Sequence, residues 1–266
     1  MGNSLVIGQY VPGQSLIHRM DPRTKMIMIT IFVVIVFFAN NFYNYGLLVV
    51  FAFLSMFLSG VPLRFVLKGL TPIWFIIILT FTLHVFITKD GTELFQVFGL
   101  TVYSGGVIQG TFISIRFFLL IFVTSLLTLT TTPIEITDAI ESMLHPLKKI
   151  KFPVHELALM MSISLRFIPT LMQETDKISK AQAARGVDFK TGPIKHRVKA
   201  IVPLLIPLFV SAFKRAEELA MAMEARGYRG GEGRTKLREL TFSRLDVITF
   251  LFFFIVVGAV IYLRQF

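Results

Sequence analysis

The stretch VIQGTFISIRFFLLIFVTSLLTL (residues 107–129) is mainly apolar and contains a single charged residue, Arg116. A helix of about 20 mainly apolar residues is long enough to cross a lipid bilayer. We therefore predict a membrane-spanning helix here. A charge inside such a helix is costly and usually faces the protein interior with a partner. Functional and structural roles for Arg116 are equally compatible with the sequence, which does not name its partner.

Four further apolar runs occupy residues 26–39, 46–61, 72–88 and 247–263. The chain is 54% hydrophobic and 16% charged, with a mean hydropathy of +0.71, whereas soluble domains average roughly 25% charged residues. This composition predicts an all-α membrane protein with about five transmembrane helices. The first run follows DPRTK (21–25), where Asp21 is the expected N-cap and Pro22 the first helical residue. No small-residue cleavage site follows this run, so we expect an uncleaved span.

Basic residues are concentrated in one polar segment. Of the 27 Lys and Arg residues, 19 lie between Pro133 and Arg244 beside 12 acids, a net charge of +7 against +11 for the chain. Positive loops are retained on the cytoplasmic side, so we expect the N-terminus and this segment inside. We predict residues 1–132 as an N-terminal segment with four spans, 133–244 as a cytoplasmic helical domain, and 245–266 as the last span. The basic residues alternate with acids, which argues against nucleic-acid binding.

The polar segment begins with a predicted amphipathic helix over 131–150. Thr132 and Glu135 have the spacing of a capping box, and Pro133 suits the first helical position. The apolar residues of this helix fall on one stripe: Ile136, Ile140, Met143, Leu144 and Leu147. Such a stripe suits a membrane surface or a partner, and internal packing is an equally good interpretation.

Two longer segments follow, from Pro153 and from Pro193, and they resemble one another. Each starts apolar, contains Ile-Pro, turns polar and ends in Ala-Arg-Gly, at 184–186 and 225–227. We predict long amphipathic helices that stop at Gly186 and Gly227 with positive φ. One arginine in a last turn is most simply a cap for free carbonyls. The same arginine at the end of two helices indicates two equivalent binding elements for a partner, because a guanidinium binds carboxylates or carbonyls bidentately. Small alanine faces suit a crossed helix pair, although helix propensity explains the alanines equally well.

Several enzyme classes are disfavoured. There is no cysteine for thiol chemistry, and His84, His145, His155 and His196 lack the spacing of metal ligands. A phosphate-binding G-x-x-x-x-G-K-[ST] loop is absent, and GYRGGEGRTK (227–236) is interpreted as a flexible connector. We therefore expect no enzymatic activity, no metal site and no bound cofactor. A stand-alone secondary transporter is the main alternative, but it usually needs coupled intramembrane ionisable groups and repeated halves.

Five stretches carry a resemblance to a known family: IHRMDPRTK (17–25), LLTLTTTPIEITDAIESMLHPLKKI (126–150), MMSISLRFIPTLMQE (160–174), KAQAARG (180–186) and AMEARG (222–227). The chain resembles the transmembrane T components (EcfT, CbiQ-like) of energy-coupling factor transporters, which are ABC-type importers of vitamins and metal ions in bacterial cell membranes.

The resemblance implies a role for each motif. The tips formed by Ala184, Arg185 and Gly186 and by Ala225, Arg226 and Gly227 would each dock into one of two ATPase subunits, which hydrolyse the ATP. Residues 133–244 would then be a coupling domain. The upper faces of its helices, with the apolar stripe of the 131–150 helix, would hold a separate membrane protein, the S component, which binds the substrate. The chain would then transmit ATP-driven motion between these partners within the lipid bilayer.

Overall fold

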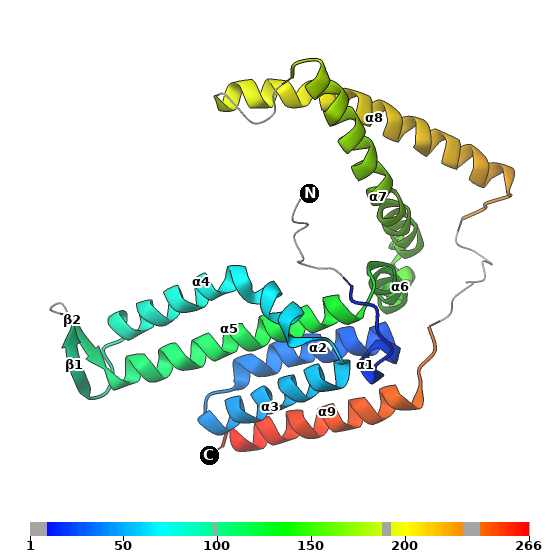
Figure 1. Cartoon of the computed structure of the whole chain (residues 1–266). Coiled ribbons are helices and arrows are strands. Elements are labelled where there is room, and N and C mark those ends of the chain that lie inside the picture. Colours follow the sequence, from blue (N-terminus) through cyan, green and yellow to red (C-terminus); the bar gives the residue numbers. More distant parts are fainter. Residues whose placement is uncertain (1–9, 98–99, 188–192, 231–239, 266) are drawn as a thin grey trace. The chain divides into compact units, whose positions relative to one another are not determined.

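A computed structural model describes residues 10–97, 100–187, 193–230 and 240–265. Contacts divide the chain into two units (Figure 1), which we name after the roles expected from the sequence: residues Met1–Ala139 with Leu240–Phe266 are called the membrane unit, and Ile140–Glu239 the coupling unit. The divisions predicted from the sequence, after 132 and after 244, remain predictions. Part of the predicted connector, residues 231–236, lies outside the described residues.

The membrane unit is almost entirely helical. Its elements in chain order are α1 (Leu16–Arg19), α2 (Pro22–Phe38), α3 (Phe42–Ser59), α4 (Leu63–Ile87), β1 (Glu93–Val97), β2 (Leu100–Tyr103), α5 (Ser104–Thr130), the start of α6 (Pro133–Leu144), and α9 (Arg244–Leu263). The predicted start of α2 is confirmed, because the Asp21 carboxylate accepts a hydrogen bond from the backbone N–H of Arg23 and Pro22 opens the helix.

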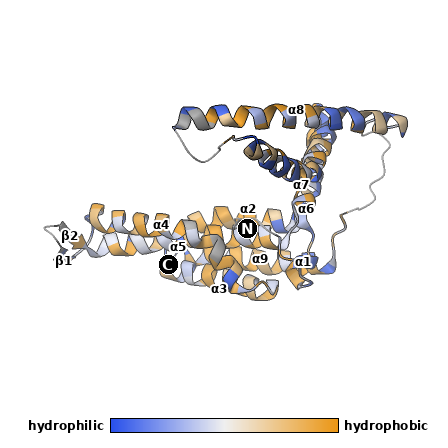
Figure 2. Ribbon diagram, turned by 45° about the horizontal axis from the view of Figure 1, so that its top comes forward, coloured by the Kyte–Doolittle hydropathy of each residue, from blue (hydrophilic) through white to orange (hydrophobic). Residues whose placement is uncertain are grey.

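Helices α2, α3, α5 and α9 pack around a common core that includes Phe32, Leu48, Phe122 and Phe253. The outward faces of the unit are apolar as well (Figure 2): Phe57 is 82% exposed and Phe75 is 72% exposed. An exposed apolar surface of this extent is unusual in water. It suits the hydrocarbon of a bilayer, where helices satisfy all their own backbone hydrogen bonds.

Among the described residues, four helices are long and apolar enough to cross a membrane: α3, α5, α7 and α9. The apolar part of α4, Ile73–Ile87, is shorter, and α2 has 17 residues. The prediction of an all-α membrane protein is confirmed. The sequence leaves the number of spans open by one because residues 157–168 and 200–213 are apolar. Of the two helices that contain these runs, α7 (Val154–Ala184) belongs to the four and α8 (Ile194–Ala225) does not.

Helices α4 and α5 lie side by side and are joined by a two-stranded antiparallel sheet. Gly106 permits their close approach, since a Cβ atom there would lie 2.9 Å from the His84 carbonyl oxygen. Gly110 faces Phe81 in the same way, one turn along. This Gly-x-x-x-Gly spacing is typical of close membrane helix pairs. Neither the spacing nor the two strands are among the features predicted from the sequence.

The coupling unit contains the end of α6, a 3₁₀ helix η1 (His145–Ile150), α7 (Val154–Ala184) and α8 (Ile194–Ala225). The predicted capping box is confirmed, because the Thr132 N–H donates to Glu135 at 3.0 Å and the Glu135 N–H to the Thr132 hydroxyl at 3.3 Å. The predicted single helix over 131–150 is wrong: α6 ends at Leu144, and Pro146, which has no backbone N–H, lies in the tighter η1.

Helices α7 and α8 are long, and each continues through its internal prolines. Figures 1 and 2 both show α8 crossing α7. The crossing is antiparallel: Gln182 near the end of α7 contacts Pro203 early in α8, while Glu174 contacts the later Ser211. The predicted crossing of two long helices is therefore confirmed within the described residues.

Candidate functional site

The two Ala-Arg-Gly sequences end α7 and α8 with the same backbone geometry. Gly186 has a φ of +87° and Gly227 a φ of +73°, which confirms the predicted positive-φ glycines. The Gly186 and Val187 N–H groups donate to the carbonyls of Ala183 and Gln182. The corresponding bonds at the second end join Gly227 to Glu224 and Tyr228 to Met223. Each end is a Schellman motif, in which the backbone itself satisfies two carbonyls.

The arginine side chains are not needed for these caps. Arg185 and Arg226 are both exposed, and neither guanidinium makes a hydrogen bond or ion pair with any other described residue. The interpretation of each arginine as a simple carbonyl cap therefore has no support in the geometry. The two guanidinium groups are instead exposed at equivalent helix ends. Each arginine directly follows an alanine, Ala184 or Ala225.

The two tips are far apart. Arg185 lies three residues beyond Gln182, whose side chain reaches the Pro203 carbonyl at 3.5 Å. From Pro203 to the end of α8 at Ala225 there are 22 residues, a rise of about 33 Å at about 1.5 Å per residue. A partner surface that receives both arginines must therefore offer two separate sites roughly 33 Å apart.

Polar contacts hold the crossed pair together. The Glu174 carboxylate of α7 accepts hydrogen bonds from the Ser211 hydroxyl at 2.6 Å and from Arg215 at 3.2 Å, both on α8. Beyond the second tip, the Tyr228 hydroxyl lies 3.5 Å from His155, whose other ring nitrogen is 3.3 Å from Glu141. The spacing of the two tips thus depends on contacts at the crossing and at the end of α8.

The apolar stripe predicted to face the S component is only partly exposed. Met143 is 40% and Leu147 37% exposed, while Ile136, Ile140 and Leu144 are half-buried, and Leu147 belongs to η1 rather than to α6. A larger apolar face is exposed on α8, and it is not among the docking surfaces predicted from the sequence. It runs along α8 and consists of exposed residues Val198, Ile201, Val202, Leu205, Ile206, Phe209, Val210 and Phe213.

The structure shows the hydrogen-bond partners of Arg116, which could not be predicted from the sequence. Its guanidinium donates to the Tyr45 hydroxyl at 2.8 Å and to the Ala39 carbonyl at 3.4 Å, and it lies 5.4 Å from the Phe37 ring centroid. Ala39 is the C-cap of α2, so the cation faces the negative end of that helix dipole. Within the described chain, no carboxylate forms an ion pair with it.

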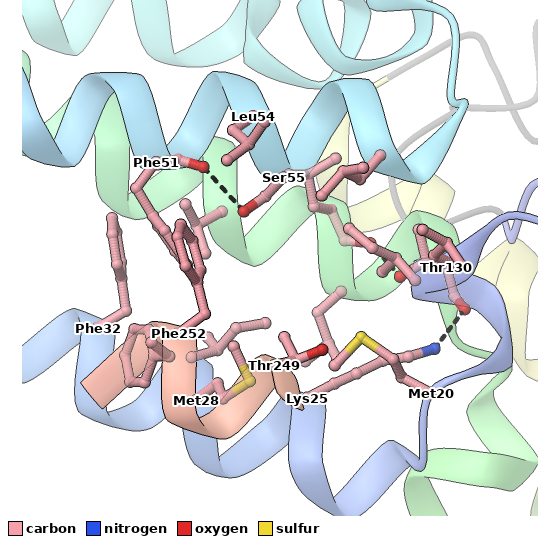
Figure 3. Close-up of a pocket in the computed structure, with 18 of the residues that line it drawn as sticks. Met20, Lys25, Met28, Phe32, Phe51, Leu54, Ser55, Thr130, Thr249 and Phe252 are labelled. Carbon is pink, nitrogen blue, oxygen red and sulfur yellow. Dashed lines mark hydrogen bonds between the residues drawn. The ribbon is translucent and has the colours of Figure 1, made fainter. Parts of the chain in front are cut away.

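A second polar cluster lies at the start of α2, in DPRTK (21–25). Lys25 is 5% exposed, and its amino group donates to the Thr130 carbonyl at 3.0 Å (Figure 3) and to the Thr131 hydroxyl at 3.2 Å. A cavity of about 360 Å³, lined mainly by apolar side chains such as Met28 and Phe252, lies beside it. Burial lowers the pKa of Lys25 to about 8, although the carboxylates of Glu135, Asp246 and Asp21 act in the opposite direction.

Comparison with known proteins identifies the family. The model of the CbiQ family, described as cobalt transport protein, matches residues 13–237 of this chain. The chain belongs to the CbiQ family. The matched region of this family includes α2 to α8, and with them both Ala-Arg-Gly tips and the polar cluster of residues 21–25.

Members of the family with high identity share one name. The chain is 61% identical over 264 residues to the energy-coupling factor transporter transmembrane protein EcfT of Bacillus subtilis, which covers 99% of this chain and 100% of that protein. It is 56% identical to EcfT of Brevibacillus brevis, over 93% of this chain and 94% of that one. It is 50% identical to EcfT of Macrococcus caseolyticus over the full length of both. The predicted family is confirmed.

Proposed function

We propose that the chain is the coupling subunit of an energy-coupling factor importer in a bacterial cell membrane. It is a membrane component of a transporter by family. The observation that carries the coupling role is the pair of equivalent helix ends, each with an exposed arginine that forms no bond within the described residues. Two identical tips about 33 Å apart suit two separate, similar sockets better than one site.

The sockets belong to two ATP-binding subunits, which hydrolyse ATP in place of this chain. Ala184, Arg185 and Gly186 enter one socket and Ala225, Arg226 and Gly227 the other. An exposed guanidinium binds a carboxylate or carbonyl group through two parallel hydrogen bonds. The cytoplasmic location of the N-terminus and the coupling unit is part of this proposal and is supported by the excess of Lys and Arg between 133 and 244.

The third partner is a membrane protein that binds the substrate, a vitamin or a metal ion. The exposed apolar face of α8, from Val198 to Phe213, is the principal docking surface, and the stripe of Ile136, Ile140, Met143, Leu144 and Leu147 contributes to it. Because α7 and α8 are rigid helices bridged at Glu174, movement of the tips moves this surface as well.

The experiment that tests the proposal is co-purification from a membrane. The chain is expressed with its two ATPase subunits, as wild type, as Arg185→Glu, as Arg226→Glu and as the double variant. We expect each single variant to lose one ATPase and the double variant to lose both, because a carboxylate cannot donate the hydrogen bonds of the guanidinium and is repelled by the acceptor oxygens that the guanidinium would bind. The melting temperature should not change, since neither side chain makes a bond within the described residues.

Lys214→Glu is the matched control, because Lys214 is an exposed cation of α8 away from both tips. It should retain both ATPases. Retention of both ATPases by the double variant, with hydrolysis and transport unimpaired, would reject the tips as docking elements. A wild-type chain that transports substrate alone in liposomes would instead establish the stand-alone carrier.

A further inference from the structure

The cluster at residues 21–25 touches both segments that connect the membrane unit to the coupling unit. The coupling unit comprises Ile140–Glu239. The chain leaves the membrane bundle at the end of α5, around Thr130, and returns to it through Leu240 before α9 begins at Arg244. All contacts described below lie within the membrane unit.

Lys25 holds the departing segment. Its amino group binds the Thr130 carbonyl at 3.0 Å and the Thr131 hydroxyl at 3.2 Å. Thr130 is the last residue of α5, where carbonyls lack intrahelical partners and a cation is favoured. Only Thr131 and Thr132 separate this point from the first residue of α6, Pro133.

Arg23 and Asp21 hold the returning segment. The Arg23 guanidinium donates to the Leu240 carbonyl at 2.9 Å and to the Asp21 carboxylate at 2.8 Å, and it lies 4.2 Å from the Phe242 ring centroid. The Asp21 N–H donates to the Asp246 carboxylate at 2.9 Å. The second oxygen of Asp246 accepts the Ser243 N–H at 2.7 Å.

Burial of these charged groups costs free energy, because they lose their contact with water. Asp246 is fully buried and Lys25 and Asp21 are 5% and 6% exposed. Apolar side chains of similar volume often stabilise a fold as well as or better than buried charges do. Stability alone therefore gives little reason for three charged groups at this place, whereas fixing two chain segments in one geometry requires directional bonds such as these.

We propose that Asp21, Arg23, Lys25 and Asp246 form a clamp that fixes to the membrane bundle the two points at which the chain leaves for the coupling unit and returns from it. Motion of the coupling unit that reaches these points is then transmitted to the membrane helices, and it is not absorbed by bending there. The four side chains are positioning residues, and their role in transport rests on the proposed function above.

Paired spin labels test the clamp. The natural chain has no cysteine, so labels can be placed at Arg64→Cys in the membrane unit and Glu217→Cys in the coupling unit, both exposed. The chain is purified with two ATPase subunits in lipid nanodiscs, and the distance distribution between the labels is measured with and without MgATP and vanadate. Clamp variants are Lys25→Met, Arg23→Gln and the pair together.

We expect a narrow distribution that shifts with MgATP in the wild type. In the double variant, the width should increase at least about twofold and the shift should be lost, while both ATPases still co-purify and still hydrolyse ATP. Lys25→Arg, which keeps the charge and the donors, should restore a narrow distribution, and Lys89→Met, at an exposed lysine outside the cluster, should have no effect.

An unchanged width and an unchanged shift in the double variant would overturn the clamp. If Lys25→Met does not fold, Thr131→Val removes only one acceptor of Lys25 and should widen the distribution to a smaller extent. Failure of the ATPases to bind the wild type would count against the proposed function. The width without ATP would still test the clamp, because it requires no partner.

Discussion

Arg185 and Arg226 end two helices whose nearby carbonyls are already bound by the backbone N–H groups that follow them. Their charges therefore remain available for a partner. The glycine after each arginine makes this possible, because a positive φ turns the chain so that the next two N–H groups reach back to the helix. The conformation of one residue thus determines how another side chain is presented.

Replacing either glycine should affect backbone conformation alone. A Cβ atom at Gly186 or Gly227 meets nothing within 4 Å, so Gly186→Ala and Gly227→Ala should each cost roughly 1–2 kcal/mol of unfolding free energy through the left-handed backbone. Chemical denaturation in detergent measures this. Gly258→Ala, within α9 and equally free of neighbours, is the control and should stabilise by about 0.5–1 kcal/mol. Similar effects at all three positions would contradict the role of positive φ.

The α7–α8 pair is the element that sets the spacing of the two tips. The bridge from Glu174 to Ser211 and Arg215 joins the helices at a half-buried position. Its contribution is moderate, because the groups are partly solvated and their attraction is screened. The bridge nevertheless selects one register, since a hydroxyl and a guanidinium must meet the same carboxylate.

Glu174→Ala should loosen this pair. We expect a loss of about 1 kcal/mol of stability and faster amide hydrogen exchange in residues 200–215 and 170–182, as the helices separate more often. Glu217→Ala, at an exposed position of α8, should leave the exchange unchanged. Equal protection in both variants would show that apolar packing alone holds the crossing.

The whole molecule combines an apolar membrane unit with a basic coupling unit, and this division predicts how the chain is oriented. Lys89 lies in the connection between α4 and β1, and Lys180 lies in α7. From the proposed orientation, we expect single cysteines at these two positions on opposite sides of the membrane. In intact cells, a membrane-impermeant maleimide should label Lys89→Cys but not Lys180→Cys. Permeabilised cells should show both labelled. Labelling of Lys180→Cys but not Lys89→Cys in intact cells would show the opposite orientation and contradict the prediction.

The sequence by itself determined the local features of this protein. The apolar helices, the start of α2 at Asp21 and Pro22, the capping box of Thr132 and Glu135, and the glycine stops depend on residues within one or two turns. Such patterns can be read because the interacting groups are neighbours in the chain. The amphipathic pattern did not predict the end of α6, because the apolar stripe continues past Pro146, whereas the proline lacks the backbone N–H that a regular α-helix needs there.

Only the tertiary structure decided the long-range pairings. The partner of Arg116, Tyr45, is 71 residues away, and the Asp21–Asp246 bond joins residues 225 apart. Neither pairing can be predicted from the spacing of residues in the sequence, because each depends on which helices pack together and on their relative positions along the helix axes. The clamp at residues 21–25 follows from that packing: the end of α5 and the start of α9 meet the start of α2, where Lys25 and Arg23 donate hydrogen bonds to the carbonyl groups of Thr130 and Leu240.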